Sequence, residues 1–512
     1  MREERKAGRR EWIGLVVLVL PLLLVSMDVS VLYFTVPFIS RDLAPTSTEQ
    51  LWIFDIYGFV LAGFLITMGA LGDRVGRRRL LMIGAVGFSA ASALAAYSGS
   101  APTLIAARAV LGVAGATLMP STLALIRNMF HDEKQRGTAI AVWTVAMTSG
   151  IALGPIVSGV LVEHFWWGSV FLINIPAMVL LLVLAPILLP EHRNPVRGRF
   201  DVAGAVLSIA AVLPVIWGIK EIAAHGVDAT RIAAIVAGLV IVTVFVRRQQ
   251  RHPDPMLDLA VLRRPAFAGS VVVSLLATFA MVGFAIFSTQ YLQLVLGMSP
   301  LEGALWSLAP TAGVGAAAPL ASTLVRRGVD RATIVAAGFV VAVGGFVLLS
   351  TVPVESGLWV LLAGAGCYAA GLVVVMSTAT ELAIGTVPPE RAGSSSALME
   401  TASEFGGALG IAILGSVGAA VYRSHLAAGQ LPAVARETLS GAVATAARLP
   451  DPAAGQVLGP ARAAFVASLH TAAWASAGIM LLAAVVALTL LRGLPVGAPR
   501  DRPVRTPDEV AA

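Results

Sequence analysis

The sequence is poor in charged residues and in cysteine, and each shortage excludes a class of protein. Only 13% of its 512 residues are charged, whereas ordinary soluble domains carry about 25%. Because 57% of the residues are hydrophobic, the composition indicates a polytopic membrane protein. The single cysteine, Cys367, excludes a disulfide framework and a cysteine-rich metal site.

Motifs of several catalytic classes are also missing. The seven histidines are scattered without metal-ligand spacing, so we expect no metal and no other cofactor. The phosphate-binding pattern G-x-x-x-x-G-K-[ST] is absent, which argues against ATP-driven transport by this chain. A membrane enzyme would need a metal or nucleophile constellation within its spans, and we find none. The chain is therefore not expected to be an enzyme.

Long apolar runs, in contrast, are abundant. A membrane-spanning helix needs about 20 mostly apolar residues, and fourteen segments meet this requirement. They lie at 12–39, 50–71, 79–98, 102–127, 137–162, 167–189, 201–221, 231–247, 266–296, 301–325, 332–351, 357–386, 392–422 and 463–491. The first resembles a signal peptide, but it lacks a small-x-small cleavage site and is interpreted as a retained span.

The formal net charge of +7 raises the question of nucleic-acid binding, and the placement of the charge answers it. If the N-terminus is cytoplasmic, most lysines and arginines fall in the two tails and in the loops on that side. This is the positive-inside signature of membrane topology. We therefore predict that both termini are cytoplasmic, that the chain lies in the bilayer, and that it binds no nucleic acid.

Two distant parts of the chain match each other. Segment 136–159 aligns with 392–415 at a constant offset of 256 residues, which places Gly154 on Gly410. The same offset aligns "GATLMPST" with "GLVVVMST" without a gap. The match predicts six spans, two inserted spans and six more, an all-α membrane fold with two pseudo-symmetric bundles that rock against each other.

This reading divides the chain into four parts. They are an N-terminal bundle at 1–195, two inserted helices and a linker at 196–262, a C-terminal bundle at 263–492, and a cytoplasmic tail at 493–512. An Ala/Gly/Pro-rich outer loop, 423–462, lies within the third part and is expected to be partly ordered.

The second repeat carries two carboxylates that the first lacks. Glu400 and Glu404 fall on Thr144 and Thr148, so the helix itself does not need them. They lie one helical turn apart in an apolar span, where charge is costly. Desolvation and mutual repulsion favour one retained proton, which a bound cation would replace. The alternative is two protonated acids that make interhelical hydrogen bonds. Glu381 is a third candidate, unless its side chain only reaches the cytoplasmic surface.

Three further ionisable residues are predicted to share one level of the membrane. A rise of about 1.5 Å per residue places Asp28, Asp55 and Arg108 about 7–9 Å below the outer ends of their spans. An unpaired charge there is expensive, so we predict that Arg108 pairs with Asp28. With Asp55 the cluster would be net acidic and suited to proton coupling. The alternatives are a static ion pair and a position of Asp55 at the headgroup level.

The stretch "GALGDRVGRRRLLMIG" (69–84) joins the second and third spans. It completes the pattern G-x-x-x-D-R-x-G-R-R with Gly69, Asp73, Arg74, Gly76, Arg77 and Arg78. By composition alone it is equally a loop that sets topology. The full pattern resembles that of the major facilitator superfamily, in which it acts as a gate latch between conformations.

Two more stretches extend the resemblance. "GIALGPIVSG", with Gly150, Gly154, Pro155 and Gly159, is similar to the antiporter motif of that family, and its glycines allow close helix packing. "LLLVSMDVSVLYFTVPFI" (22–39) resembles the first-span motif of the fourteen-helix drug:proton antiporters. The chain is most similar to Qac-type exporters of quaternary ammonium compounds and dyes.

The resemblance implies proton-coupled efflux of lipophilic organic cations by alternating access. It implies a monomer in the bacterial cytoplasmic membrane whose partners are cationic substrates, protons and the lipid bilayer. Asp28, Arg108 and Asp55 would couple protons, and the glutamates would bind both substrate and protons. The alternative function is export of an uncharged antibiotic or metabolite, in which these acids carry protons only.

Overall fold

The computed structural model describes residues 7–191, 201–251, 259–385, 392–427 and 431–492, and these contain helices but no strand. The first part holds α1 (Arg9–Ser30), the 3₁₀ turn η1 (Val31–Phe34), α2 (Val36–Leu43), α3 (Ser47–Val75), α4 (Arg77–Ala96), α5 (Ala101–Met129), α6 (Glu133–His164), α7 (Ser169–Leu172) and α8 (Asn174–Leu188). Then follow α9 (Val202–His225) and α10 (Ala229–Arg251). The last part holds α11 (Leu259–Leu262), α12 (Pro265–Gln290), the π turn η2 (Tyr291–Val295), α13 (Pro300–Trp306), α14 (Ala309–Arg326), α15 (Arg331–Leu349), α16 (Leu358–Gly385), α17 (Ala392–Leu426), α18 (Ala433–Glu437), α19 (Leu439–Ala446) and α20 (Asp451–Leu490).

Within this described part, twelve helices are long and apolar enough to cross a membrane, or thirteen if the bent α3 counts as one span. They coincide with all but one of the fourteen predicted segments. The segment 50–71 lies in α3, which bends by 47°. The remaining segment, 301–325, is divided between α13 and α14, because the helix breaks after Trp306 and restarts beside Pro310.

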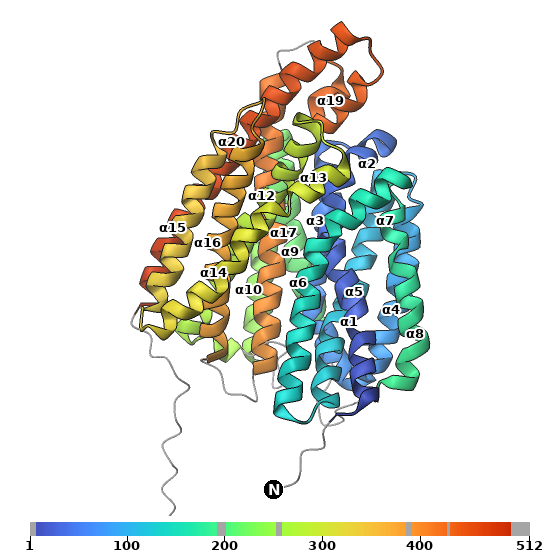
Figure 1. Cartoon of the computed structure of the whole chain (residues 1–512), viewed down its shortest axis with the longest axis vertical. Coiled ribbons are helices and arrows are strands. Elements are labelled where there is room, and N and C mark those ends of the chain that lie inside the picture. The colour runs from blue at the N-terminus through green and yellow to red at the C-terminus, as the bar shows by residue number, and fades with distance from the viewer. Residues whose placement is uncertain (1–6, 192–200, 252–258, 386–391, 428–430, 493–512) are drawn as a thin grey trace, which may run out of the picture.

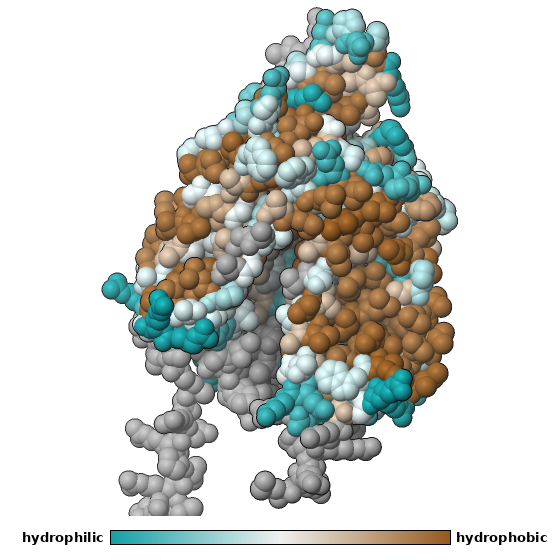
Figure 2. All heavy atoms as spheres, in the orientation of Figure 1, coloured by the Kyte–Doolittle hydropathy of each residue, from teal (hydrophilic) through white to brown (hydrophobic). Residues whose placement is uncertain are grey.

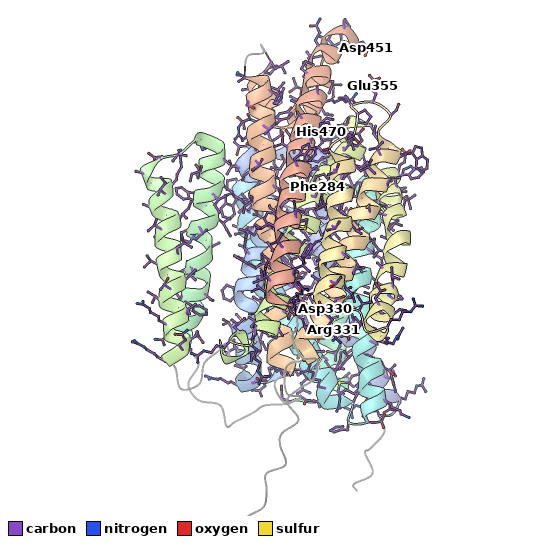
Figure 3. All side chains as sticks on the ribbon, turned by 90° about the vertical axis from the view of Figure 1, so that its left-hand side faces the viewer. Phe284, Asp330, Arg331, Glu355, Asp451 and His470 are labelled. Atoms are coloured by element: carbon purple, nitrogen blue, oxygen red, sulfur yellow. The ribbon has the colours of Figure 1, made fainter. Side chains whose placement is uncertain are left out.

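The helices run along the long axis in two groups (Figure 1). One group contains α1 and α3 to α8, the other α12 to α17 with α20, and α1 begins at the same end of the molecule at which α20 ends. Helices α9 and α10 pack against each other and stand at one edge (Figure 3), where α9 also contacts α3 and α17. The inserted pair therefore touches both groups through α9.

The sequence repeat corresponds to a repeated helix crossing. Gly154 of α6 lies against α1, where an added Cβ would be 2.9 Å from the carbonyl oxygen of Met27. Gly410 of α17 lies against α12, where an added Cβ would be 2.0 Å from the carbonyl oxygen of Phe279. Only glycine allows two backbones to approach this closely. Equivalent positions of the repeat thus form equivalent contacts in the two groups.

The two groups touch at one end and separate toward the other. The side-chain amide of Gln293, in η2, donates to the carbonyl oxygen of Phe34, at the end of η1, at 3.0 Å. Helices α2 and α13, which follow these turns, lie toward the upper end of Figure 1. Nearby, the carboxylate of Glu163 accepts from the backbone N–H of Leu301 at 3.2 Å. Figure 2 shows a groove between the groups that opens toward the lower end. The structure is therefore closed above and open below.

The segment 423–462, predicted as an outer loop, is mostly helical in its described part. Helix α17 extends to Leu426, α18 and α19 follow, and α20 begins at Asp451, at the upper end of Figure 3. Helix α19 packs against α20 and α2. The expected partial order is therefore present, in the form of a small helical cap.

We predict that Gly410→Ala lowers the thermal unfolding temperature of the purified protein. The new Cβ would meet the backbone of α12, and overpacking of this kind costs about 1–3 kcal/mol. Gly478→Ala in α20 is the matched control, because an added Cβ there meets nothing within 4 Å. Equal unfolding temperatures for the two variants would contradict the close crossing of α12 and α17.

Candidate functional site

The predicted pair of Asp28 and Arg108 is present. The guanidinium of Arg108 on α5 donates to Oδ2 of Asp28 on α1 at 2.7 Å, and both side chains are only 1% exposed. Oδ1 of Asp28 has no hydrogen-bond donor among the described residues. Because a buried carboxylate oxygen without a donor is costly, this atom is a suitable place for a proton.

Aromatic and backbone groups hold Arg108 in position. Its guanidinium lies 5.0 Å from the ring centroid of Tyr57 and donates to the carbonyl oxygen of Phe54 at 3.4 Å. The hydroxyl of Tyr57 in turn donates to the carbonyl oxygen of Val25 on α1 at 3.1 Å. Helices α1, α3 and α5 therefore meet at this ion pair, so that a change in its charge state acts on all three.

Asp55 also lies in this layer, but its surroundings differ from the prediction. Its carboxylate accepts from the ammonium of Lys220 on α9 at 2.8 Å, and both side chains are fully buried. Asp55 is therefore shielded from solvent by the surrounding protein. The predicted net acidic cluster is also wrong, because Lys220 balances Asp55 just as Arg108 balances Asp28.

Lys220 was not among the predicted site residues, although the sequence carries a signal for it. Lys220 lies near the outer end of α9, which runs outward on the predicted topology. The same rise of about 1.5 Å per residue places it about 7 Å below that end. This is the level of Asp55, and a buried lysine needs an acidic partner.

Glu400 and Glu404 differ from the residues of the two buried ion pairs, Asp28 with Arg108 and Asp55 with Lys220. Both are half-buried on α17, one turn apart, and neither makes a hydrogen bond or ion pair with another described residue. The counterpart of Glu400, Thr144, donates to the carbonyl oxygen of Ile140 within its own helix, and the side chain of Thr148 lies outside the described residues. The two acids are thus available to a ligand. They would not be available if they made interhelical hydrogen bonds, the alternative given above.

Glu404 faces the other group of helices. It lies within electrostatic reach of Tyr33 and Tyr57, and the neighbouring Phe405 packs on Phe59 with ring centroids 6.1 Å apart. Tyr57 also contacts Arg108. The glutamate pair and the Asp28–Arg108 pair therefore border one aromatic region between α3 and α17.

Glu381 is held apart from the pair. It lies near the end of α16 and forms an ion pair with Arg331 at 2.9 Å, with its side chain 47% exposed. Arg331 begins α15, at the lower end of the molecule in Figure 3. This contact agrees with the alternative that the side chain reaches the surface.

The loop motif forms a charge network at the same lower end. Asp73 pairs with Arg77 across the turn, and Gly76 between α3 and α4 has a φ of 110°, which favours glycine. The backbone N–H of Arg78 donates to Glu191 at 3.2 Å, and its side chain donates to the carbonyl oxygen of Leu189 at 3.0 Å. These contacts tie the α3–α4 turn to the end of α8. Gly69 and Arg74 complete the motif within α3, and Arg74 has further interactions there.

Three glycines and a proline of the second motif shape the contacts of α6. An added Cβ at Gly150 would lie 2.4 Å from the Leu23 carbonyl oxygen on α1, and one at Gly159 would lie 2.9 Å from the Cα of Leu301. Gly154 makes the crossing described above. The motif therefore allows α6 to approach both α1 and α13.

Pro155 leaves a carbonyl oxygen without its helical donor. Proline has no N–H, so the oxygen of Ile151, four residues earlier, loses its usual partner. The hydroxyl of Ser30, at the end of α1, donates to this oxygen at 2.8 Å. The motif therefore joins α6 to α1, the helix that carries Asp28, by a hydrogen bond and not by packing alone.

Comparison with known proteins identifies the fold. The profile of the Major Facilitator Superfamily matches residues 18–411. A bacterial homologue of the human lysosomal transporter Spinster, solved in an inward-facing, unoccupied conformation, superposes with a TM-score of 0.64 over 95% of this chain and 99% of that one, at 16% identity.

Several bacterial relatives are similar over almost their whole length. The multidrug efflux pump LfrA of Mycolicibacterium smegmatis is 43% identical over 93% of this chain and 95% of its own. The methyl viologen resistance protein SmvA of Salmonella typhimurium is 34% identical over 94% and 98%. The tetracenomycin C resistance and export protein of Streptomyces glaucescens is 32% identical over 97% and 94%.

These relatives, the apolar helices and the fold agree with one another. They identify a multi-pass protein of the bacterial inner membrane that transports small molecules and is not an enzyme. The chain belongs to the Major Facilitator Superfamily.

Proposed function

We propose that this protein exports lipophilic organic cations in exchange for protons, by alternating access. The observation that carries the proposal is the pair of Glu400 and Glu404, two half-buried acids without a partner among the described residues beside an aromatic region. Acids in an apolar environment favour cationic ligands or protons. Aromatic rings favour the same cations through their faces.

The relatives support this substrate class. LfrA is a multidrug efflux pump and SmvA a methyl viologen resistance protein. Methyl viologen carries two quaternary nitrogens, so its charge matches two carboxylates. The loss of one positive partner leaves a carboxylate uncompensated, which is costly in a low-dielectric site. A pair of glutamates that share one proton therefore accommodates either a dication or a monocation with a proton.

Proton coupling is assigned to Asp28 and Arg108. When Asp28 is protonated, Arg108 loses its partner, and the contacts among α1, α3 and α5 change. These helices meet α6 and α17 at the boundary between the two groups. A proton at Asp28 thus changes the balance between conformations without touching the substrate.

The proposed architecture has fourteen spans and both termini in the cytoplasm. Two six-helix bundles, with boundaries at 1–195 and 263–492, flank the inserted helices α9 and α10. Segment 301–325 would span as the broken pair α13 and α14. On this orientation the groove in Figure 2 opens to the cytoplasm, and the Asp73 network acts as the gate latch on that side.

Efflux of ethidium from bacterial cells tests the function. Cells that express the protein are expected to lose preloaded ethidium faster than cells with an empty vector, and a protonophore is expected to abolish the difference. Equal rates for both cell lines would overturn cation export. An unchanged difference in the presence of the protonophore would overturn proton coupling.

We predict that Asp28→Asn abolishes efflux of every substrate. The change removes the titratable group and leaves Arg108 buried without a charged partner, which costs about 3–5 kcal/mol. The paired variant Asp28→Asn with Arg108→Gln removes both charges and serves as the folding control. Efflux assays at matched membrane abundance are expected to show no activity in either variant. Normal efflux by the paired variant would show that the ion pair is static.

We predict that Asp73→Asn slows transport of all substrates and leaves their affinities unchanged. The change removes the ion pair with Arg77 at the α3–α4 turn, on the proposed cytoplasmic side. The proposed substrate-binding glutamates lie on another helix, α17. Initial efflux rates and binding affinities of ethidium would be compared in the same preparation. An efflux rate equal to that of the wild type would indicate that the motif only determines the membrane topology.

We predict that Glu400→Gln or Glu404→Gln impairs efflux of methyl viologen more than efflux of ethidium. One remaining carboxylate balances a monocation but leaves one charge of a dication uncompensated, at a cost of about 3–5 kcal/mol. The double variant is expected to lose both substrates. Efflux of the two compounds would be measured in all three variants at matched abundance. Equal impairment in the single variants would favour a role in carrying protons only.

A further inference from the structure

The ammonium of Lys220 lies in a complete cation site. It is 2.8 Å from each carboxylate oxygen of Asp55 and 3.7 Å from the ring centroid of Trp52. Asp55 and Lys220 are fully buried, and Trp52 is half-buried. A carboxylate beside the face of an aromatic ring is the combination that recognises ammonium ligands.

The three residues come from two different parts of the fold. Trp52 and Asp55 belong to α3 in the first group, whereas Lys220 belongs to the inserted helix α9. A fold of two six-helix bundles needs no such cation from outside the bundles. A hydrophobic side chain at this position would also pack well, and replacement of a buried ion pair by such residues is often neutral or stabilising. The lysine therefore calls for a reason beyond stability.

The site lies where the two groups of helices meet. Trp52 and Phe405 pack on a cluster that contains Phe59 of α3, Ile216 of α9 and Ala408 of α17. Helix α17 is also the helix of the glutamate pair. A cation that leaves Glu404 for the closed, upper end thus passes beside α3 and α9.

Helix α9 is connected to both groups near this end. Lys220 pairs with α3, and the guanidinium of Arg423 on α17 donates to the carbonyl oxygen of Ala223 at 2.9 Å. If the upper ends of the groups separate, α9 cannot keep both contacts unchanged. Opening of the upper side therefore acts directly on the position of Lys220.

We propose that Trp52 and Asp55 form a second cation subsite, for organic ammonium groups, and that Lys220 fills it as a tethered occupant while the upper side is closed. The proposal rests on the export of organic cations proposed above. On opening, Lys220 withdraws and a substrate ammonium group takes its place on the way out. On closing, Lys220 returns and expels the substrate. The substrate is therefore not carried back across the membrane when the protein changes conformation.

Binding of benzyltrimethylammonium to the purified protein in lipid nanodiscs tests the proposal. Lys220→Gln removes the tethered cation, and we expect calorimetric titration to show binding about tenfold tighter than in the wild type, equivalent to about 1.4 kcal/mol. Addition of Asp55→Asn or Trp52→Ala to Lys220→Gln is expected to remove the gain. Lys134→Gln, a change at an exposed lysine, is the matched control and is expected to bind as the wild type does.

An affinity of Lys220→Gln equal to that of the wild type would overturn the proposal. A gain that persists with Asp55→Asn and with Trp52→Ala would place the extra binding elsewhere and also overturn it. Wild-type protein that neither binds nor exports the compound would instead overturn the proposed function, so the two failures are distinct.

A second variant applies if Lys220→Gln does not fold. Asp55→Asn with Lys220→Gln removes both charges and keeps two polar side chains of similar size. A structural ion pair predicts wild-type efflux for this variant at matched abundance, and that result would overturn the proposal. The cation subsite predicts at least a several-fold loss of efflux.

Discussion

Burial of charge away from water is the constraint on which this structure depends. An ionised group in the low-dielectric interior is tolerated only with a partner. Two buried ion pairs, Asp28 with Arg108 and Asp55 with Lys220, satisfy this constraint in the described part of the chain. Glu400 and Glu404 lack such partners there. Charge is therefore neutralised where helices are joined and left open where a ligand is proposed to bind.

The glycine contacts determine how these charges are presented. Close crossings of α6 on α1 and of α17 on α12 bring backbone against backbone. On α17, the side chain of Phe405 then lies at the boundary between the two groups, against Phe59 of α3. Because the crossings are equivalent, the threonine-bearing helix α6 and the glutamate-bearing helix α17 occupy comparable places. At equivalent positions the two helices thus differ in their side chains, threonine in α6 and glutamate in α17.

Much of this could be predicted from the sequence, because the signals were local or periodic. Apolar runs gave the helices, a constant offset gave the repeat, and a fixed rise per residue placed Asp28 and Arg108 at one level. Contacts between segments without a shared motif were not accessible in this way. Lys220 was not predicted as a site residue: its depth matches that of Asp55, but depth alone does not select a partner 165 residues away. The break between α13 and α14 likewise depends on local helix geometry that hydropathy does not report.

Proton release on cation binding tests the central claim, that substrate and protons share the same carboxylates. Purified protein in weakly buffered detergent solution would be mixed with the dication methyl viologen while the pH is recorded. The account predicts release of protons by the wild type and none by Glu400→Gln with Glu404→Gln. Methyl viologen binding by the wild type without any release of protons would contradict it.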